Sequence, residues 1–148
     1  MDAYDLIISG TQLRKLITKY VEPIIEEYGL RPVELDILEF ITRENLTTAK
    51  EIMLRRHLSK SHISKSLEHL LEKGFIKIHE DENDHRVMRI SLTDDSYKLI
   101  DRINEAYEKC RTILLREISE DELHIFREVI HKMNNNVDGE LKKQDEID

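Results

Sequence analysis

Short polar and cationic side chains occupy one face of a helical segment near the middle of the chain. Lys60, Ser61, Ser64 and Lys65 recur at helical intervals, whereas the apolar residues of this segment fall on the opposite face. Small hydroxyl side chains let a helix approach the floor of the DNA major groove, and lysines contact phosphate or guanine. The free amides at a helix start add a phosphate site. We therefore expect DNA contacts by Ser59, Lys60, Ser61, His62, Ser64 and Lys65.

A second group of charged side chains follows in residues 84–89. Asp84 and Arg86 are two residues apart, so in an extended chain they point the same way, and the carboxylate can orient the guanidinium for insertion into a minor groove. Arg89 adds a further predicted DNA contact. The alternative is an ion pair that only stiffens a turn. The DNA interpretation also requires the acidic run at residues 80–82 to point away from phosphate.

The elements that must position these side chains are mostly helices. Helical spacing and capping residues predict helices over residues 4–28, 32–44, 48–56, 60–73, 94–117 and from 120 onward, with a tail that frays from Asp138. Gly29 and Gly74 suit the ends of the first and fourth helices. Thr48 and Ser119 each begin a capping box, in which a hydroxyl and a glutamate satisfy backbone amides reciprocally.

Residues 75–92 change to a strand pattern. Apolar and polar residues partly alternate there on both sides of a polar turn, which predicts a β-hairpin. The third and fourth helices, joined by a short turn, form a helix-turn-helix candidate. Arg55 and Arg56 lie beside that turn and are further predicted DNA contacts. A polar face between a helix-turn-helix and a hairpin favours DNA contact over an ordinary solvated surface.

Apolar residues of the fifth and sixth helices repeat at steps of three and four, as in a coiled coil. The first helix also has an apolar face. We interpret these seams as a dimer interface, and the residues predicted to form it are Leu13, Ile17, Ile103, Tyr107, Cys110, Leu114, Phe126, Ile130, Met133 and Val137.

Composition limits the class of protein. The chain has 148 residues, which suits one domain, and its 36% of charged residues with only four Gly and two Pro indicates a mainly α protein with a small β component, an α+β fold. A single cysteine excludes an internal disulfide. The acidic start lacks the basic region of a signal peptide, and no apolar run has the length of a membrane span, so we expect a cytoplasmic protein without a membrane partner.

The charge is unevenly distributed. The whole chain has a net charge of −8, which by itself disfavours nucleic acid as a partner. Residues 48–90, however, hold nine Lys and Arg against seven Asp and Glu, a net of +2, and five of the seven histidines. The segment with the predicted DNA contacts is therefore electrostatically distinct from both ends.

Residues from about 30 to 100 resemble the MarR family of bacterial winged-helix regulators. The strongest match is the stretch 84–93, DHRVMRISLT, which is similar to the family's wing pattern of Asp, any residue, Arg, an apolar strand and Leu-Thr. The stretch 70–76, LLEKGFI, is similar to the end of the family's recognition helix. The flanking ends match only in their helix layout. Two departures are Ile78, where the family often has arginine, and the absence of the first-helix cysteine of its peroxide-sensing branch.

The resemblance implies a winged helix-turn-helix at residues 31–93, flanked by long N- and C-terminal dimerisation helices at residues 1–30 and 94–148. It implies that the fourth helix reads DNA, that Arg86 enters the minor groove with Asp84 as its orienting partner, and that a homodimer binds a pseudo-palindromic operator, most simply as a repressor. Many members of the family respond to small aromatic or anionic molecules, so such an effector is a further expected partner.

Other functions have weaker support in the residues. Cys110 lies on the seam of the fifth helix, and we interpret it as a packing residue and not as a redox switch. The histidines lack the spacing of a metal site, and no phosphate loop or nucleophile motif indicates an enzyme or a cofactor. The competing hypothesis is a winged-helix dimerising adaptor that binds protein, which the net negative charge favours. Steep salt dependence of duplex binding separates the two.

Overall fold

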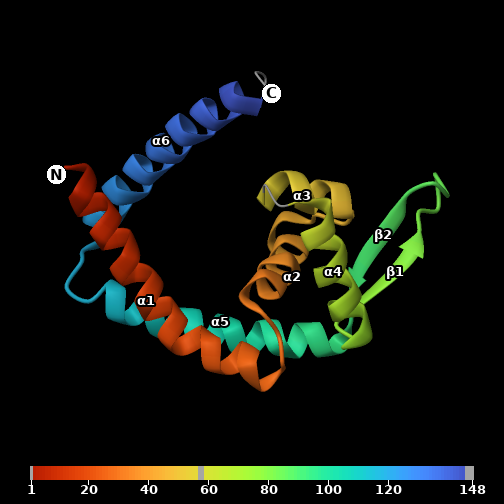
Figure 1. The fold of residues 1–148 in the computed structure, drawn as a ribbon. Helices are drawn as coiled ribbons and strands as arrows, with labels where there is room; N and C mark the ends of the chain where they lie inside the picture. The colour runs from red at the N-terminus through yellow and green to blue at the C-terminus, as the bar shows by residue number, and fades with distance from the viewer. Residues whose placement is uncertain (1, 57–58, 146–148) are drawn as a thin grey trace. The chain divides into compact units, whose positions relative to one another are not determined.

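The computed structural model describes residues 2–56 and 59–145, and of their side chains all but those of Ala3, Arg56 and residues 142–145. Two compact units divide the chain, Met1–Arg111 and Thr112–Asp148. The elements in chain order are α1 (Ala3–Glu27), α2 (Pro32–Glu44), α3 (Ala49–Arg56), α4 (Lys60–Glu72), β1 (Ile76–Glu80), β2 (Met88–Leu92), α5 (Asp94–Leu114) and α6 (Glu120–Asp145) (Figure 1).

The predicted helix ends follow from backbone conformation. Gly29 and Gly74 have φ angles of +67° and +76°, a region that costs glycine little, and each directly follows the C-cap residue of its helix. The sixth helix differs from the prediction, because it continues through the polar segment after Asp138 to Asp145. Residues 140–144 of this segment are good helix formers, whereas Asp138 and Gly139 at its start are poor ones.

The core of the first unit joins all its helices to the hairpin. Its largest fully buried side chains include Ile37 and Leu38 of α2, Ile52 of α3 and Leu70 of α4. The two strands pair in antiparallel register, with Ile78 opposite Ile90, and Ile90 is buried. The apolar base of the hairpin is therefore anchored in the core, while its turn extends away from the helices (Figure 1).

The seam of α5 is partly covered within the single chain. Ile103 is fully buried and Cys110 is 3% exposed there, so both side chains pack inside their own subunit, and their assignment to a dimer interface stays a prediction. The Cys110 sulfur lies 3.8 Å from the carbonyl of Leu16 in α1. A periodic apolar stripe shows that a helix face is covered, but the stripe is the same whether its own chain or a second chain covers it.

Tyr107, on the same seam, is also tied to its own chain. Its hydroxyl donates a hydrogen bond of 3.2 Å to Oε2 of Glu39 in α2. Burial raises the pKa of Glu39, and burial together with the Glu39 carboxylate raises the pKa of Tyr107, so the tyrosine stays a neutral donor at physiological pH. The contact joins α5 to α2, the first helix of the predicted DNA-binding region.

The second unit consists mainly of α6, which begins with the predicted capping box. The amide of Ser119 donates to Glu122 at 2.8 Å, and the amide of Glu122 donates to the Ser119 hydroxyl at 3.3 Å. The apolar residues predicted for the dimer interface are exposed on this helix: Phe126, Ile130, Met133 and Val137. On α1, Leu13 and Ile17 are exposed as well, and so is Leu114 at the end of α5.

The described residues contain neither a membrane-spanning helix nor a cluster of metal-ligating side chains. None of the helices in residues 2–56 and 59–145 combines the length and hydropathy needed to cross a bilayer. Within the same ranges, no three His, Cys, Asp or Glu side chains come together as metal ligands would.

Candidate nucleic-acid interface

Packing of the helix-turn-helix determines which face of α4 is outward. Ile63, Leu67 and Leu70 are buried against the core, together with Ser66, which is 3% exposed. Leu71, which the spacing also assigns to the buried stripe, is 45% exposed, so that assignment is wrong. The residues predicted to contact DNA are all exposed: Ser59, Lys60, Ser61, His62, Ser64 and Lys65.

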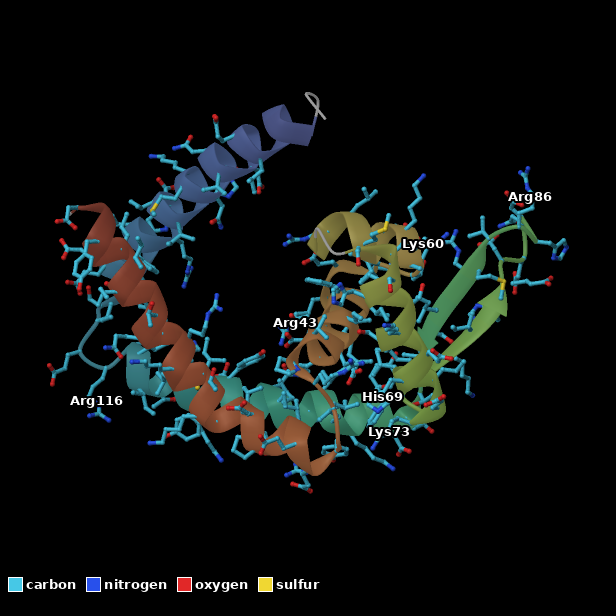
Figure 2. The ribbon with its side chains drawn as sticks, in the orientation of Figure 1. Arg43, Lys60, His69, Lys73, Arg86 and Arg116 are labelled. Carbon is cyan, nitrogen blue, oxygen red and sulfur yellow. The ribbon has the colours of Figure 1, made fainter. Side chains whose placement is uncertain are left out.

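The first turn of α4 is fixed by its cap. Ser59 is the N-cap, and its hydroxyl accepts a hydrogen bond from the amide of His62 at 3.3 Å. The same hydroxyl lies 3.0 Å from Nδ1 of the His62 ring, a contact that does not use Nε2. Ser59 therefore works mainly as a cap, while Lys60, Ser61 and Ser64 extend outward beside it. Figure 2 shows Lys60 projecting from this end of α4, with His69 and Lys73 at the opposite end.

Arg55 of α3 differs from the lysines of α4 in having partners within the protein. The Arg55 guanidinium lies over the ring of Phe40 and donates from Nε to Glu44 at 2.8 Å, so α2 holds it against the protein. The Arg56 side chain and His57 lie outside the part of the chain that the structure describes.

Asp84 and Arg86 form the pair that their spacing predicts. Arg86 donates from Nε and Nη2 to the two carboxylate oxygens of Asp84, both at 3.0 Å, and its amide donates to Oδ1 at 3.1 Å. The paired guanidinium holds the pKa of Asp84 below its ordinary value. The Arg86 side chain remains 90% exposed at the turn of the hairpin (Figure 2). A cation held by two parallel hydrogen bonds in this position is presented to solvent in a defined direction.

The acidic run at the turn is partly used inside the hairpin. Asp81 accepts hydrogen bonds from the amides of Asn83 and Asp84 at 2.9 and 3.0 Å and from Nε of Arg89 at 2.6 Å. These partners, Arg89 first, lower the pKa of Asp81 and keep it ionised. Glu80 lies 3.1 Å from Nδ1 of His85. Asp81 therefore stabilises the turn through its own hydrogen bonds, and Glu80 lies beside a histidine.

Arg89, unlike Arg86, is held by contacts within the protein. Besides Asp81, it donates from Nη1 to the hydroxyl of Thr47 at 2.7 Å, and its side chain is only 37% exposed. The sequence pattern grouped Arg89 with Arg86 as a DNA contact and did not identify Thr47 or Asp81. An aspartate whose side chain accepts from the amides two and three residues later is a common turn pattern, so the role of Asp81 in the turn could have been predicted from the sequence. Thr47 lies 42 residues from its partner, and no local signal identifies such a contact.

A buried carboxylate ties α4 to the corner between α1 and α2. Glu34 is fully buried, and its carboxylate accepts from the amide and Nε of Arg31, each at 2.8 Å, and lies 2.8 Å from Nδ1 of His69 in α4. Burial opposes ionisation of Glu34, but the hydrogen bonds from Arg31 and His69 outweigh it, so its pKa is below the ordinary value. Lys73 adds a contact of 3.4 Å to the carbonyl of Tyr28. The recognition-helix candidate is thus held at its C-terminal half.

Comparison with known proteins places this fold. The model of the MarR family matches residues 28–87. The chain is 26% identical over 145 residues to the HTH-type transcriptional regulator PecS of Dickeya dadantii, covering 91% of this chain and 87% of that protein.

Solved structures share the fold over nearly the full length. The Staphylococcus aureus MarR in complex with salicylate and kanamycin is similar with a TM-score of 0.76 at 23% identity, covering 91% of each chain. A Staphylococcus aureus MepR variant bound to an oligodeoxyribonucleotide is similar with a TM-score of 0.61 at 18% identity, covering 93% of this chain and 99% of that chain. The helix-turn-helix and the arginine at the tip of the hairpin thus lie within the residues 28–87 that match the model of the MarR family, and the fold is that of the solved MarR proteins.

Proposed function

We propose that the protein is a MarR-type transcriptional regulator that binds duplex DNA sequence-specifically as a homodimer and represses transcription by occupying a promoter. The observation that carries the proposal is that two surfaces suited to DNA lie on one compact unit. The outward face of α4 presents hydroxyl and cationic side chains, and the hairpin presents Arg86 held by Asp84. The MepR variant among the structural neighbours was solved with an oligodeoxyribonucleotide, which supports the same partner here.

The two surfaces have separate tasks in this proposal. Ser61 and Ser64 approach base edges in the major groove, because their side chains are short and exposed. Lys60 and Lys65 neutralise phosphates. Arg86 enters the adjacent minor groove, where narrow A·T tracts concentrate negative potential. Arg89 is left out of the contact set, because its guanidinium is already engaged by Asp81 and Thr47.

A dimer is proposed because large apolar side chains are exposed on two helices. Leu13 and Ile17 of α1 and Phe126 and Met133 of α6 are each more than a third exposed. Faces of this kind mark association surfaces. A two-fold dimer places its recognition helices about 34–36 Å apart and reads a pseudo-palindrome.

A protein-binding adaptor is the second candidate, and the net charge of −8 favours it. The two functions differ in their response to salt. DNA affinity must fall steeply as salt rises, because lysine and arginine contacts release counterions from phosphate. Retention on heparin with salt-dependent binding to random duplexes supports the DNA proposal, and no binding in dilute salt contradicts it.

We further propose that a small aromatic or anionic molecule releases the DNA. The support is the similar MarR protein whose structure contains salicylate. Titration of salicylate into a preformed protein–duplex complex, followed by fluorescence anisotropy, tests this part by itself. Unchanged anisotropy up to millimolar salicylate contradicts it for this probe without affecting the DNA proposal.

Selection of bound sequences from a random duplex library gives the operator, and Arg86→Ala then tests the hairpin. We expect about tenfold weaker binding to every duplex and a salt slope reduced by about one per subunit. Lys98→Ala is the matched control, since it removes one positive charge from α5, outside the helix-turn-helix and hairpin. Equal affinity of Arg86→Ala and the unmodified protein removes the hairpin from the proposed function.

A further inference from the structure

A continuous chain of hydrogen bonds links the start of α3 to the tip of the hairpin. Glu51 accepts from the amides of Thr47 and Thr48, both at 2.9 Å, which fixes the residues just before α3. The carbonyl of Thr47 accepts from the amide of Ile90 in β2 at 2.7 Å, and its hydroxyl accepts from Arg89 at 2.7 Å. The loop before α3 is therefore attached to β2 through both backbone and side chain.

The series of hydrogen bonds continues through Asp81 to Arg86. One oxygen of Asp81 accepts from Arg89 at 2.6 Å, and the other accepts from the amides of Asn83 and Asp84. Asp84 in turn holds the Arg86 guanidinium in a two-point contact. Each residue in this series fixes the next, from the helix-turn-helix to the exposed cation.

The hairpin needs such a connection. A two-stranded hairpin is marginally stable by itself, and only its base is buried in the core. On one face of the hairpin, Ile76 and Ile90 are 2% and 4% exposed, whereas Ile78, opposite Ile90, is already 37% exposed and Met88, nearer the tip, is 49% exposed. Apolar packing therefore does not determine the direction of the tip, and polar contacts are left to do so.

We infer that Asp81 and Arg89 are positioning residues for the minor-groove contact of Arg86, setting the direction of the hairpin tip relative to α3 and α4. The inference rests on the proposed function, because it requires that Arg86 contacts DNA. It assigns a function to two charged residues that do not themselves touch DNA. Asp81 contributes a negative charge near phosphate, which by Coulomb repulsion alone would weaken binding.

Because of that repulsion, the direction in which a substitution of Asp81 changes DNA affinity distinguishes positioning from simple charge repulsion. Asp81→Asn keeps an oxygen that can accept from the turn amides but loses the ion pair with Arg89. We expect it to weaken binding to the selected duplex about fivefold, although it removes a negative charge. Glu82→Gln is the matched control, since it removes the same charge from an exposed position of the same turn, and we expect it to leave binding unchanged or to strengthen it.

The Arg86→Ala background provides the second criterion. If Asp81 acts through Arg86, Asp81→Asn should change affinity less than twofold once Arg86 is absent. Thr47→Val removes the other anchor of Arg89 without changing any charge, and we expect a loss of about twofold to threefold that also disappears in the Arg86→Ala background. Thermal melting by circular dichroism establishes whether each variant is folded. If Asp81→Asn does not fold, the result for Thr47→Val tests the positioning role by itself.

The outcomes separate this inference from the function on which it rests. A full effect of Arg86→Ala, with Asp81→Asn behaving like Glu82→Gln, overturns only the positioning role. A loss of equal size for Asp81→Asn with and without Arg86 also overturns it, because the residue would then act by another route. If Arg86→Ala binds DNA normally, the minor-groove proposal itself fails, and with it the positioning role.

Discussion

Arg86 and Arg89 are three residues apart in one hairpin, yet their surroundings give them different tasks. The Arg86 side chain is 90% exposed and held only by Asp84, whereas that of Arg89 is 37% exposed and bridges Asp81 and Thr47. An exposed, pre-oriented guanidinium can contact a ligand without giving up other partners. A guanidinium with two partners would have to break both contacts, and leaving a partly buried carboxylate unpaired costs free energy.

The serines and lysines of α4 should differ in what their loss changes. Ser64→Ala should alter the preferred sequence in a repeated library selection and change affinity for random duplexes little, because base contacts carry specificity. Lys65→Ala should weaken binding to all duplexes alike and reduce the salt slope by about one per subunit, as expected for a phosphate contact. A uniform loss for Ser64→Ala with unchanged preference would reassign it to the phosphate backbone.

The contacts of Glu34 predict how the free energy of unfolding depends on pH. Its pKa is lowered in the folded protein from an ordinary value of 4.5, so its contribution is fully present above about pH 4.5 and disappears as the pH falls through the lowered value. Glu34→Gln should therefore reduce the free energy of unfolding by about 2 kcal/mol at pH 7. The difference from the unmodified protein should shrink as the pH falls below 4.5.

Urea unfolding at several pH values between 3.5 and 7 measures this effect. Glu68→Gln is the control, because Glu68 is exposed on α4 and surface substitutions usually change stability by less than about 0.5 kcal/mol. A difference between Glu34→Gln and the unmodified protein that stays constant over this pH range would show that the ionised carboxylate is not its source.

At the scale of elements, α5 serves mainly as a core helix of its own subunit within the first unit. Ile103 and Leu99 are fully buried, and Arg102 on the same helix pairs with Glu27 of α1 at 2.8 Å. Tyr107 connects the same helix to Glu39 of α2. A helix that contacts both α1 and α2 is suited to connect the proposed dimerisation region to the proposed DNA-binding region.

Substitution of Ile103 tests this role of α5. Ile103→Ala should lower the free energy of subunit unfolding by about 2–5 kcal/mol, because it leaves a cavity in a closed core. The folded fraction should keep its oligomeric state in light scattering. Leu71→Ala, at a site 45% exposed, should cost about 1 kcal/mol or less. Dissociation of folded Ile103→Ala subunits would support the predicted place of Ile103 in the dimer interface.

For the whole molecule, the distribution of charge and of apolar surface separates two functions. The proposed DNA contacts lie within residues 48–90, which have a net charge of +2 although the chain has −8. The exposed apolar residues that the sequence assigns to a dimer interface lie outside that segment, on α1, at the end of α5 and on α6. In the proposed function, the acidic remainder of the chain limits nonspecific attraction to DNA, and short-range contacts of α4 and the hairpin are expected to determine where the protein binds.

A charged substitution on α6 should separate assembly from folding. Phe126→Glu places a charge on a side chain that is 57% exposed in the single subunit, so we expect the dimer to dissociate while the helical content is retained. DNA affinity should then fall at least tenfold, because each subunit reads only one half-site. Asn134→Glu puts the same charge at an exposed polar position of α6 and is the control.

Light scattering and circular dichroism measure the two properties independently. An intact Phe126→Glu dimer would place the interface elsewhere. A subunit that remains monomeric but binds the selected duplex with undiminished affinity would contradict the proposed two-fold reading of DNA.

Local patterns were enough to determine the elements and part of the site. The order of six helices and one hairpin follows from hydrophobic period and capping residues, and the glycines at 29 and 74 end their helices in the predicted conformation. The Asp84–Arg86 pair was also predictable, because two residues on one side of an extended chain are neighbours. In each case the interacting groups are close in sequence, so the local backbone geometry determines the contact.

Only the tertiary structure decided what covers each helix face and which cationic side chains already have partners within the protein. The stripe of α5 has the same period whichever chain packs on it, so burial of Ile103 and Cys110 within their own subunit could not be deduced. Arg89 and Thr47, and likewise Glu34 and His69, meet across 42 and 35 residues. Such contacts depend on how elements pack, a property that no local spacing encodes, and they determine whether a charged side chain holds the fold or faces DNA.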